Sequence, residues 1–167
     1  SRDGFELAVA VFLRVSDYLI VRGHWNEAMD LAFMLLDETK RNGDDISAAR
    51  LRTWPIGWVY RHRGQLQLAK EETSKGLEVL EGSEDKWFTA YAKRNLGRTY
   101  QELGDYDRAE ALLREALDCY QEEEDDHHIY FLTANLASVA LARGNLEEAR
   151  ELCHGILPKL ELMDAPE

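Results

Sequence analysis

The segment LGRTYQELGDYDRAEALLREAL, residues 96–117, predicts the local fold of this chain. Each half carries apolar residues at the three- and four-residue spacing of a helix, and Gly104 lies between the halves. A glycine can end the first helix in a left-handed conformation at little cost. Asp105 is a favourable residue to begin the second helix. The segment therefore predicts two antiparallel helices joined by a short turn.

The same pattern recurs four times along the chain. Four glycines separated by 41, 40 and 40 residues are each followed five residues later by an alanine. The pairs are Gly23 with Ala28, Gly64 with Ala69, Gly104 with Ala109, and Gly144 with Ala149. Gly57 and Gly97, in the first helices of two units, would let the paired helices approach closely. One helix pair cannot bury its apolar faces alone, so the pairs must stack.

These observations predict an all-α fold with eight helices. The expected ranges are about 4–22, 25–41, 46–63, 66–81, 85–103, 106–122, 127–143 and 146–162. Pro55 falls inside the third helix, where it should remove a backbone hydrogen bond and cause a kink. We expect one domain over 1–167, with repeats at about 9–49, 50–89, 90–129 and 130–163. Because the sequence starts without Met, we expect it to be a fragment of a larger protein.

Composition excludes several classes of function. The 167 residues contain 20 Lys and Arg against 32 Asp and Glu, a net charge of −12, which argues against nucleic acid and anionic membrane as partners. There is no signal peptide and no apolar run of about 18 residues, the length that a membrane span needs. Cys119 and Cys153 are too few for a disulfide framework, and we expect buried free thiols in a cytoplasmic protein.

The repeated unit resembles the tetratricopeptide repeat. The matching pieces are Leu96-Gly97-x-x-Tyr100, Gly104-x-Tyr106-x-x-Ala109 and Ala116. The resemblance runs from about Val9 to Leu162, and the 40-residue unit is similar to the arrays of kinesin light chains, cell-polarity adaptors and bacterial signalling ATPases of the NB-ARC (STAND) type. The stretches GWVYRHRGQLQLA, 57–69, and ALARGNLEEAR, 140–150, most resemble the bacterial group.

The resemblance implies a right-handed α-solenoid of four antiparallel helix pairs. Its concave groove would be lined by the first helix of each pair and would bind a peptide or a segment of the same polypeptide. The family supplies no catalytic residues, so the resemblance implies neither enzyme activity nor a cofactor. The chaperone-tail carboxylate clamp is not expected, because Leu13, Asp17 and Pro55 occupy its positions.

Groove candidates are the residues that flank the packing positions on the first helices. They are Arg14, Asp17, Trp54, Trp58, Arg61, His62, Tyr91, Arg94, Asn95, Arg98, Gln101, Phe131, Asn135 and Ser138. Asn95 and Asn135 occupy equivalent places in successive repeats. Each amide could hold the backbone of an extended peptide, or could bond to a neighbouring helix.

Charge is distributed unevenly along the chain. Residues 46–70 and 87–101 contain no acid, whereas residues 105–126 contain ten acids and two arginines. Arg94 and Arg98 are four residues apart and could grip one carboxylate together. A basic, aromatic strip predicts a ligand with acidic and apolar side chains. In the alternative, these arginines pair with the neighbouring acidic helices.

Other patterns do not predict chemistry. His127 and His128 follow an acidic run, but adjacent side chains on a helix diverge by about 100°, so we expect no metal site. There is no phosphate-binding loop and no nucleophile in a recognised context. Enzyme activity is therefore not expected.

The sequence thus favours a non-catalytic module that binds a peptide or protein segment. A second hypothesis is the sensor arm of a multidomain signalling ATPase or transcription regulator. A third is an architectural role through end-to-end self-association, because we expect part of the last helix to be uncovered. The apolar residues of that helix are Leu152, Ile156, Leu157, Leu160, Leu162 and Met163.

Overall fold

A computed structural model describes the backbone of residues 2–163 and the side chains of residues 4–157. All regular elements in this part of the chain are helices. They are α1 (Arg2–Val21), α2 (Trp25–Asn42), α3 (Asp45–Leu51), η1 (Arg52–Gly57), α4 (Trp58–His62), α5 (Leu66–Glu81), α6 (Lys86–Glu102), α7 (Tyr106–Glu122), α8 (Asp126–Ala142) and α9 (Leu146–Met163).

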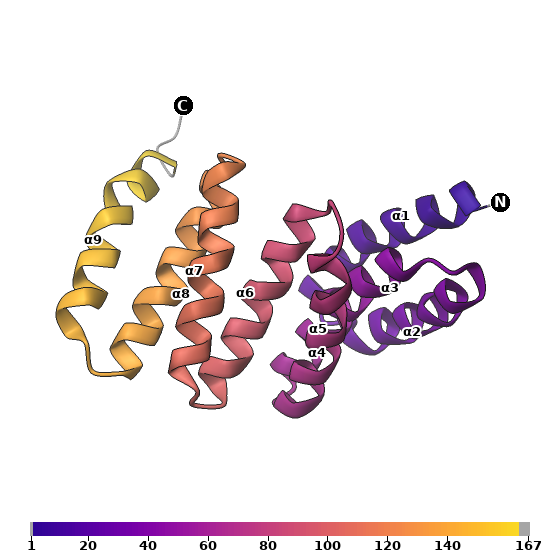
Figure 1. Cartoon of the computed structure of the whole chain (residues 1–167), viewed down its shortest axis with the longest axis horizontal. Coiled ribbons are helices and arrows are strands. Elements are labelled where there is room, and N and C mark those ends of the chain that lie inside the picture. Colours follow the sequence, from indigo (N-terminus) through magenta and orange to yellow (C-terminus); the bar gives the residue numbers. More distant parts are fainter. Residues whose placement is uncertain (1, 164–167) are drawn as a thin grey trace.

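The helices form four antiparallel pairs that lie side by side (Figure 1). In the second pair, the first helix consists of α3, η1 and α4 in succession. The first helices contact one another in a row, because α1 packs on α3 and η1, η1 packs on α6, and α6 packs on α8. Between the pairs, α2 packs on α3, α5 on α6, and α7 on α8. The predicted all-α solenoid is therefore confirmed, and the predicted helix boundaries agree with the structure to within two residues.

The turn predicted from the opening segment has the expected geometry. Gly104 has a φ of 82°, in the left-handed region, and its amide donates to the carbonyl of Gln101 at 3.0 Å. The Asp105 carboxylate then accepts from the backbone amide of Arg108 at 3.2 Å and caps α7. These contacts satisfy backbone groups that a helix end leaves free.

Three apolar clusters hold the pairs together. One joins the first and second pairs around Ile20, Leu36 and Ile56. A second, smaller cluster around Leu80 and Leu96 joins the second and third pairs. The third cluster joins the last two pairs and includes Leu113, Leu132 and Leu136 among its buried members. Each pair thus shares apolar packing with its neighbours, as in other stacked repeats.

The small residues of the repeat mark close approaches between helices. Ala28, Ala69, Ala109 and Ala149 are all buried. A Cβ atom on Gly57 would lie 2.2 Å from the Thr73 hydroxyl and 2.9 Å from the Arg52 carbonyl. A Cβ atom on Gly97 would lie 3.0 Å from Leu113 Cγ. Both glycines are therefore required by packing, and the constraint is tighter at Gly57.

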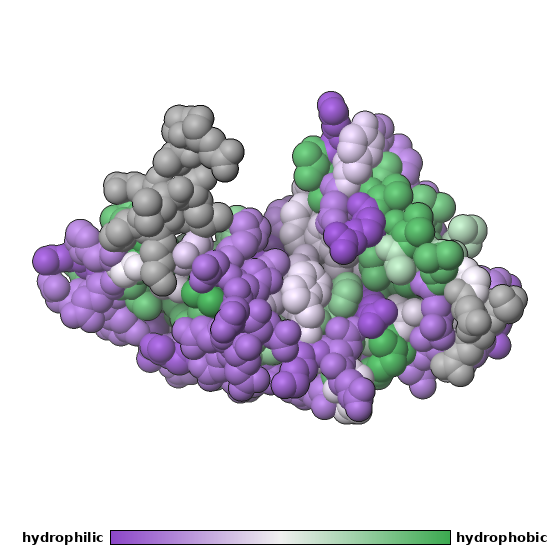
Figure 2. Space-filling model, turned by 90° about the horizontal axis from the view of Figure 1, so that it is seen from above, coloured by the Kyte–Doolittle hydropathy of each residue, from purple (hydrophilic) through white to green (hydrophobic). Residues whose placement is uncertain are grey.

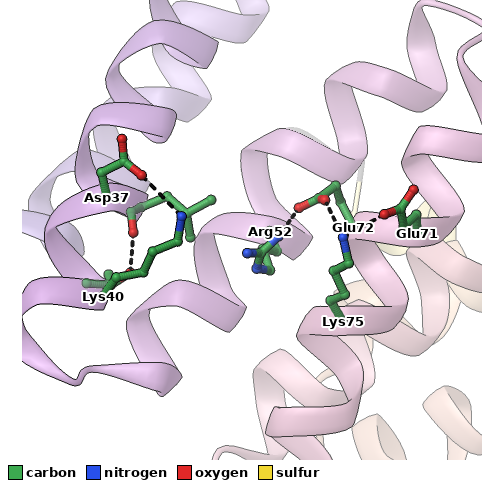
Figure 3. Close-up of polar contacts among 8 residues, drawn as sticks. Asp37, Lys40, Arg52, Glu71, Glu72 and Lys75 are labelled. Atoms are coloured by element: carbon green, nitrogen blue, oxygen red, sulfur yellow. Dashed lines mark hydrogen bonds and ion pairs between the residues drawn. The ribbon is translucent and has the colours of Figure 1, made fainter.

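The kink predicted at Pro55 is confirmed. Proline lacks the backbone donor that a regular helix needs, and the helix is interrupted beside Pro55, within η1. Trp54 leaves helical geometry, with φ −141° and ψ 125°. Ion pairs join the kinked helix to α5, because Arg52 bonds to Glu72, which also binds Lys75 at 3.2 Å (Figure 3).

The N-terminal end of the solenoid carries a row of exposed apolar side chains. They lie on α1 and are Leu7, Val11, Val15, Tyr18 and Val21. Green, apolar surface gathers at this end, on the right of Figure 2. The sequence pointed instead to the last helix. There Leu157 is exposed and Leu152 half-buried, Ile156 is buried, and Leu160, Leu162 and Met163 lie outside the described side chains.

The two cysteines are less buried than the sequence predicts. Both cysteines are free, but Cys119 is half-buried and Cys153 is exposed. The prediction of a buried thiol was therefore wrong for Cys153, because no described helix covers the face of α9 that carries it. None of the helices in residues 2–163 is long and apolar enough to cross a bilayer.

Candidate functional site

The row of first helices encloses a cavity of about 420 Å³. Residues from α1, α3, η1 and α6 line it, so it spans the first three helix pairs. Its lining residues are Ala10, Leu13, Arg14, Asp17, Arg50, Trp54, Trp87, Phe88 and Tyr91. We call this the aromatic cavity, since four of its nine residues carry aromatic rings.

Trp54 enters this cavity because of the kink. Its extended backbone turns the side chain out of the helical path, and the indole N–H lies 3.4 Å from the carbonyl oxygen of Leu13 on α1. The indole also packs edge-on against Trp58, at 5.4 Å, and against Tyr91, at 6.0 Å. The predicted groove residues Trp54 and Tyr91 are thus brought together across two helix pairs.

A column of planar groups continues along α6. Trp87 stacks on Tyr91 with ring centroids 5.4 Å apart and planes 14° apart, and the Arg94 guanidinium lies 4.6 Å from the Tyr91 centroid. These residues are separated by four and three positions, so they share one face of the helix. Burial raises the pKa of Tyr91, although Arg94 and Asn95 oppose the shift. The Tyr91 hydroxyl is therefore a neutral donor over the physiological pH range.

The arginines of the predicted basic strip divide into two groups. Arg50 pairs with Asp85 at 2.6 Å, Arg52 pairs with Glu72, and Arg61 pairs with Glu102 at 2.7 Å. For these three, the structure supports the alternative in which the strip pairs with neighbouring acids. Among the described side chains, Arg94 and Arg98 have no ion pair, although both are partly buried.

The absence of a counterion has an electrostatic consequence at Arg98. Burial lowers its pKa, and the positive charges of Arg61 and Arg94 lower it further, whereas Glu102 acts in the opposite direction. The Arg94 Nε atom is buried and has no hydrogen-bond partner among the described residues. This part of the groove therefore presents positive charge that its immediate surroundings do not neutralise. We call Arg94 and Arg98 the arginine pair.

Arg61 and His62 form a polar end to the aromatic cluster. Arg61 is only 3% exposed, and one of its terminal nitrogens lies 3.3 Å from Nε2 of His62. The His62 ring stacks on Trp58 at 3.4 Å and its Nδ1 lies 2.9 Å from the Trp58 carbonyl oxygen. Burial lowers the pKa of His62. These contacts hold Trp58 and His62 in fixed positions outside the aromatic cavity.

The two predicted asparagines differ in environment. Asn95 is 2% exposed, and its side-chain amide lies 3.4 Å from the Thr53 carbonyl oxygen in η1. It therefore joins two helix pairs, the second of the two alternatives, and its burial argues against direct contact with a ligand. Asn135 is half-buried and remains a candidate for the first alternative.

The remaining candidates extend the groove towards the fourth pair. Gln101 donates to the Ser138 hydroxyl at 2.7 Å and so links α6 to α8. Phe131 is 54% exposed and packs edge-on against His127 at 4.8 Å. This end of the groove is polar apart from the Phe131 ring.

Five residues of the aromatic cavity were not among the groove candidates predicted from the sequence. These are Ala10, Leu13, Arg50, Trp87 and Phe88. Arg50 belonged to the predicted basic strip, and helical spacing could have found Trp87, because it precedes Tyr91 by four residues. Ala10 and Phe88 depend on how the pairs stack, which the spacing within one helix does not specify.

The histidines that follow the acidic run take part in packing. His128 stacks on Tyr120 at 4.6 Å, and its Nδ1 lies 2.7 Å from Asp125 Oδ2. In the part of the chain with described residues, no group of three or more potential ligands could hold a metal ion.

The fold defines a class of protein, an all-α protein built from stacked helix-pair repeats. Profiles of the tetratricopeptide repeat match residues 48–122 and 131–154. These residues are therefore tetratricopeptide repeats, a family of generally non-catalytic modules that bind proteins or peptides.

Solved structures with the same fold share little sequence with this chain. BtubC (BKLC) from P. vanneervenii has a TM-score of 0.80 and 18% identity, over 98% of this chain and 67% of that one. A Podospora anserina protein named for kinesin light chain, with nearly identical TPR-like repeats, has TM-scores of 0.68 and 0.67 in two structures. Its identity is 18%, over 89% and 95% of this chain and 72% and 77% of those chains. Comparison with curated proteins gives no match.

Proposed function

We propose that this chain binds an extended protein segment with acidic and apolar side chains along its row of first helices. The observation that carries the proposal is the arginine pair beside the aromatic cavity. An apolar side chain would enter the cavity, and an acidic group would bind Arg94 and Arg98. The arginine pair and three cavity residues, Trp87, Phe88 and Tyr91, all lie on α6, so a single ligand segment can reach both.

Energetic arguments support this assignment. Tryptophan, tyrosine and arginine contribute most to binding energy at protein interfaces. In this groove they are held by stacking and hydrogen bonds, so little side-chain entropy is lost when a ligand binds. An acid-rich chain that keeps two partly buried arginines without ion pairs forgoes stability, which favours a functional role for that pair.

The experiment fills the cavity without removing any existing contact. Ala10 is exposed on α1 and lines the cavity, so Ala10→Phe should occupy the space while the helix stays intact. Binding of fluorescein-labelled degenerate peptides, rich in Glu and Leu, is measured by fluorescence anisotropy. We expect Ala10→Phe to weaken binding by about tenfold or more.

Ala8→Phe is the matched control, because Ala8 is also exposed on α1 and does not line the cavity. It should bind the peptides as the unaltered chain does. Equal binding by both variants and the unaltered chain, or no binding of any peptide, would contradict the proposed function.

A second candidate function is self-association, which the exposed apolar row on α1 favours. Two copies could bury this row against each other or against the last helix pair. Sedimentation equilibrium of the unaltered chain and of Val11→Glu should then differ in mean mass. A monomer in both would reject this candidate.

The ligand segment could also belong to the same polypeptide, as in a sensor arm of a signalling ATPase or transcription regulator. That hypothesis and the cytoplasmic location remain predictions from the sequence.

A further inference from the structure

We infer that the arginine pair is a site for a phosphomonoester dianion, carried as a phosphorylated serine or threonine on the bound segment. This inference rests on the proposed function, because the segment must lie in the groove for its phosphate to reach Arg94 and Arg98. It adds a chemical distinction, since the site would prefer a phosphorylated side chain to an aspartate or glutamate.

The arginines around the groove outnumber their ion-pair partners. Arg61 pairs with Glu102 at 2.7 Å, and the same carboxylate also attracts Arg98. Arg94 and Arg98 themselves form no ion pair among the described residues. A carboxylate would neutralise one of these charges, and a phosphomonoester carries a charge of about −1.5 to −2 at neutral pH.

The arginine pair differs from the other partly buried arginines in having no ion pair among the described residues. Arg50, Arg52 and Arg61 are the other arginines whose described side chains are at least partly buried, and each forms an ion pair. Burial of a charge without a partner is costly. The arginine pair is thus an exception to the pattern of the chain, and a ligand of matching charge would remove that cost.

Two guanidinium groups on one helix face suit the hydrogen-bond geometry of a phosphate. A guanidinium presents a planar fork of donors, and a carboxylate with two oxygens saturates one fork. A phosphate group has three terminal oxygens and can accept from the terminal nitrogens of two guanidinium groups at once. Arg94 and Arg98, four residues apart on α6, therefore match a phosphate better than a carboxylate.

Aromatic neighbours hold the Arg94 guanidinium in position. The Arg94 guanidinium lies 4.6 Å from the Tyr91 ring centroid, in the column that begins at Trp87. Arg98 lies one helical turn further along α6, on the same face as Arg94. Arg94 is therefore fixed before the ligand arrives, and the aromatic neighbours reduce the screening of its charge by water.

The first experiment uses small probes and the full chain. Phenyl phosphate and benzoate share an aromatic ring and differ in their anionic group. Their binding is followed by the arginine Nε–Hε signals in NMR spectra, which are assigned from their loss in Arg94→Gln and Arg98→Gln. We expect phenyl phosphate to shift both signals, with a Kd about tenfold or more below that of benzoate. Equal affinities for the two probes would overturn the inference.

Variants of the pair test the geometry. Arg98→Gln should raise the Kd for phenyl phosphate by about tenfold or more. Arg98→Lys keeps the charge and loses the fork, so it should abolish most of the preference for phenyl phosphate over benzoate. Arg150→Gln is the matched control, because Arg150 is exposed on α9, outside the row of first helices, and it should change the Kd by less than about twofold. An effect of Arg150→Gln as large as that of Arg98→Gln would overturn the assignment to this pair.

The second experiment separates this inference from the proposed function. Short degenerate peptides carry phosphoserine, glutamate or serine at one fixed position, and their binding is compared with that of inorganic phosphate. Tightest binding of the phosphoserine set supports the inference. Equal binding of the phosphoserine and glutamate sets would overturn the inference and leave the proposed function intact. Inorganic phosphate that binds as tightly as the phosphoserine peptides would overturn the assignment to a phosphorylated segment.

Discussion

The second and third helix pairs share one repeat pattern but carry different side chains at two equivalent groove positions. With Gly64 and Gly104 aligned, Trp54 and Trp58 of the second pair occupy the places of Arg94 and Arg98 in the third. The second pair is kinked at Pro55 and contributes indole rings, whereas α6 runs without a break and carries guanidinium groups. The comparison shows that packing positions are kept from repeat to repeat while groove positions change, so ligand chemistry varies along one surface.

The largest expected effect tests the packing positions. Gly57→Ala places a Cβ atom 2.2 Å from the Thr73 hydroxyl, whereas Gly97→Ala meets Leu113 Cγ at 3.0 Å. We expect Gly57→Ala to lower the free energy of unfolding by about 2 kcal/mol, and Gly97→Ala by about 1 kcal/mol or less. Urea denaturation followed by circular dichroism measures both. Equal losses would mean that the two pairs relax alike despite their different backbones.

The second-largest change in the free energy of unfolding is expected when a paired arginine is replaced, and it can be compared with replacement of an unpaired one. Arg61→Met removes the partner of Glu102 and should cost about 1–2 kcal/mol of unfolding free energy, because Arg61 is buried and Glu102 remains partly solvated. Arg98→Met removes a partly buried charge without an ion pair among the described residues. It should leave the denaturation midpoint unchanged or raise it. A large loss for Arg98→Met would indicate that Arg98 is structural.

A smaller difference in stability is expected between alanine variants of the two asparagines. Asn95→Ala leaves the buried Thr53 carbonyl without the side-chain amide that lies 3.4 Å away, and should cost about 1 kcal/mol. Asn135→Ala should change the free energy of unfolding by less than about 0.5 kcal/mol, because Asn135 is half-buried. Thermal denaturation of the two variants side by side decides whether only the third pair uses its asparagine for packing.

The smallest effect is expected from pH. Burial lowers the pKa of His128 below its ordinary value of 6.5, and Arg94 and His127 act in the same direction, whereas Asp125 opposes them. The folded chain therefore holds this proton less tightly than the unfolded chain. The contribution to stability is full above the ordinary pKa and is lost as pH falls through the folded pKa.

The pH prediction is measured as the melting temperature between about pH 7 and pH 5. His62 shifts in the same direction, so both the unaltered chain and His128→Gln should lose stability in acid, but the variant should lose less. An equal loss in the two proteins would contradict the assignment to His128.

Much of the fold could be predicted because the repeat depends on short sequence patterns that act locally. Gly104 and Asp105 mark a helix end and a helix start through backbone preferences that act within a few residues. Ala109 and Gly97 mark a close helix contact through side-chain volume. These signals recur with a period of 40, so the stacking of four pairs followed from the sequence.

The candidate site was predictable only in part. Spacing on one helix identified Tyr91, Arg94 and Arg98 as residues of one face. It could not show that Asn95 is turned towards Thr53, because that contact joins segments 42 residues apart. The repeat alone also gave no reason to expect that Trp54 would leave helical geometry and reach Leu13 on α1.

The sequence by itself determined that this protein is an all-α stack of tetratricopeptide-type helix pairs with a basic, aromatic strip. The tertiary structure decided which arginines of that strip are neutralised. Arg50, Arg52 and Arg61 form ion pairs with acids elsewhere in the chain, whereas Arg94 and Arg98 form none among the described residues. The physical reason is that Coulomb attraction depends on distances in space, and those distances are fixed when the helix pairs stack.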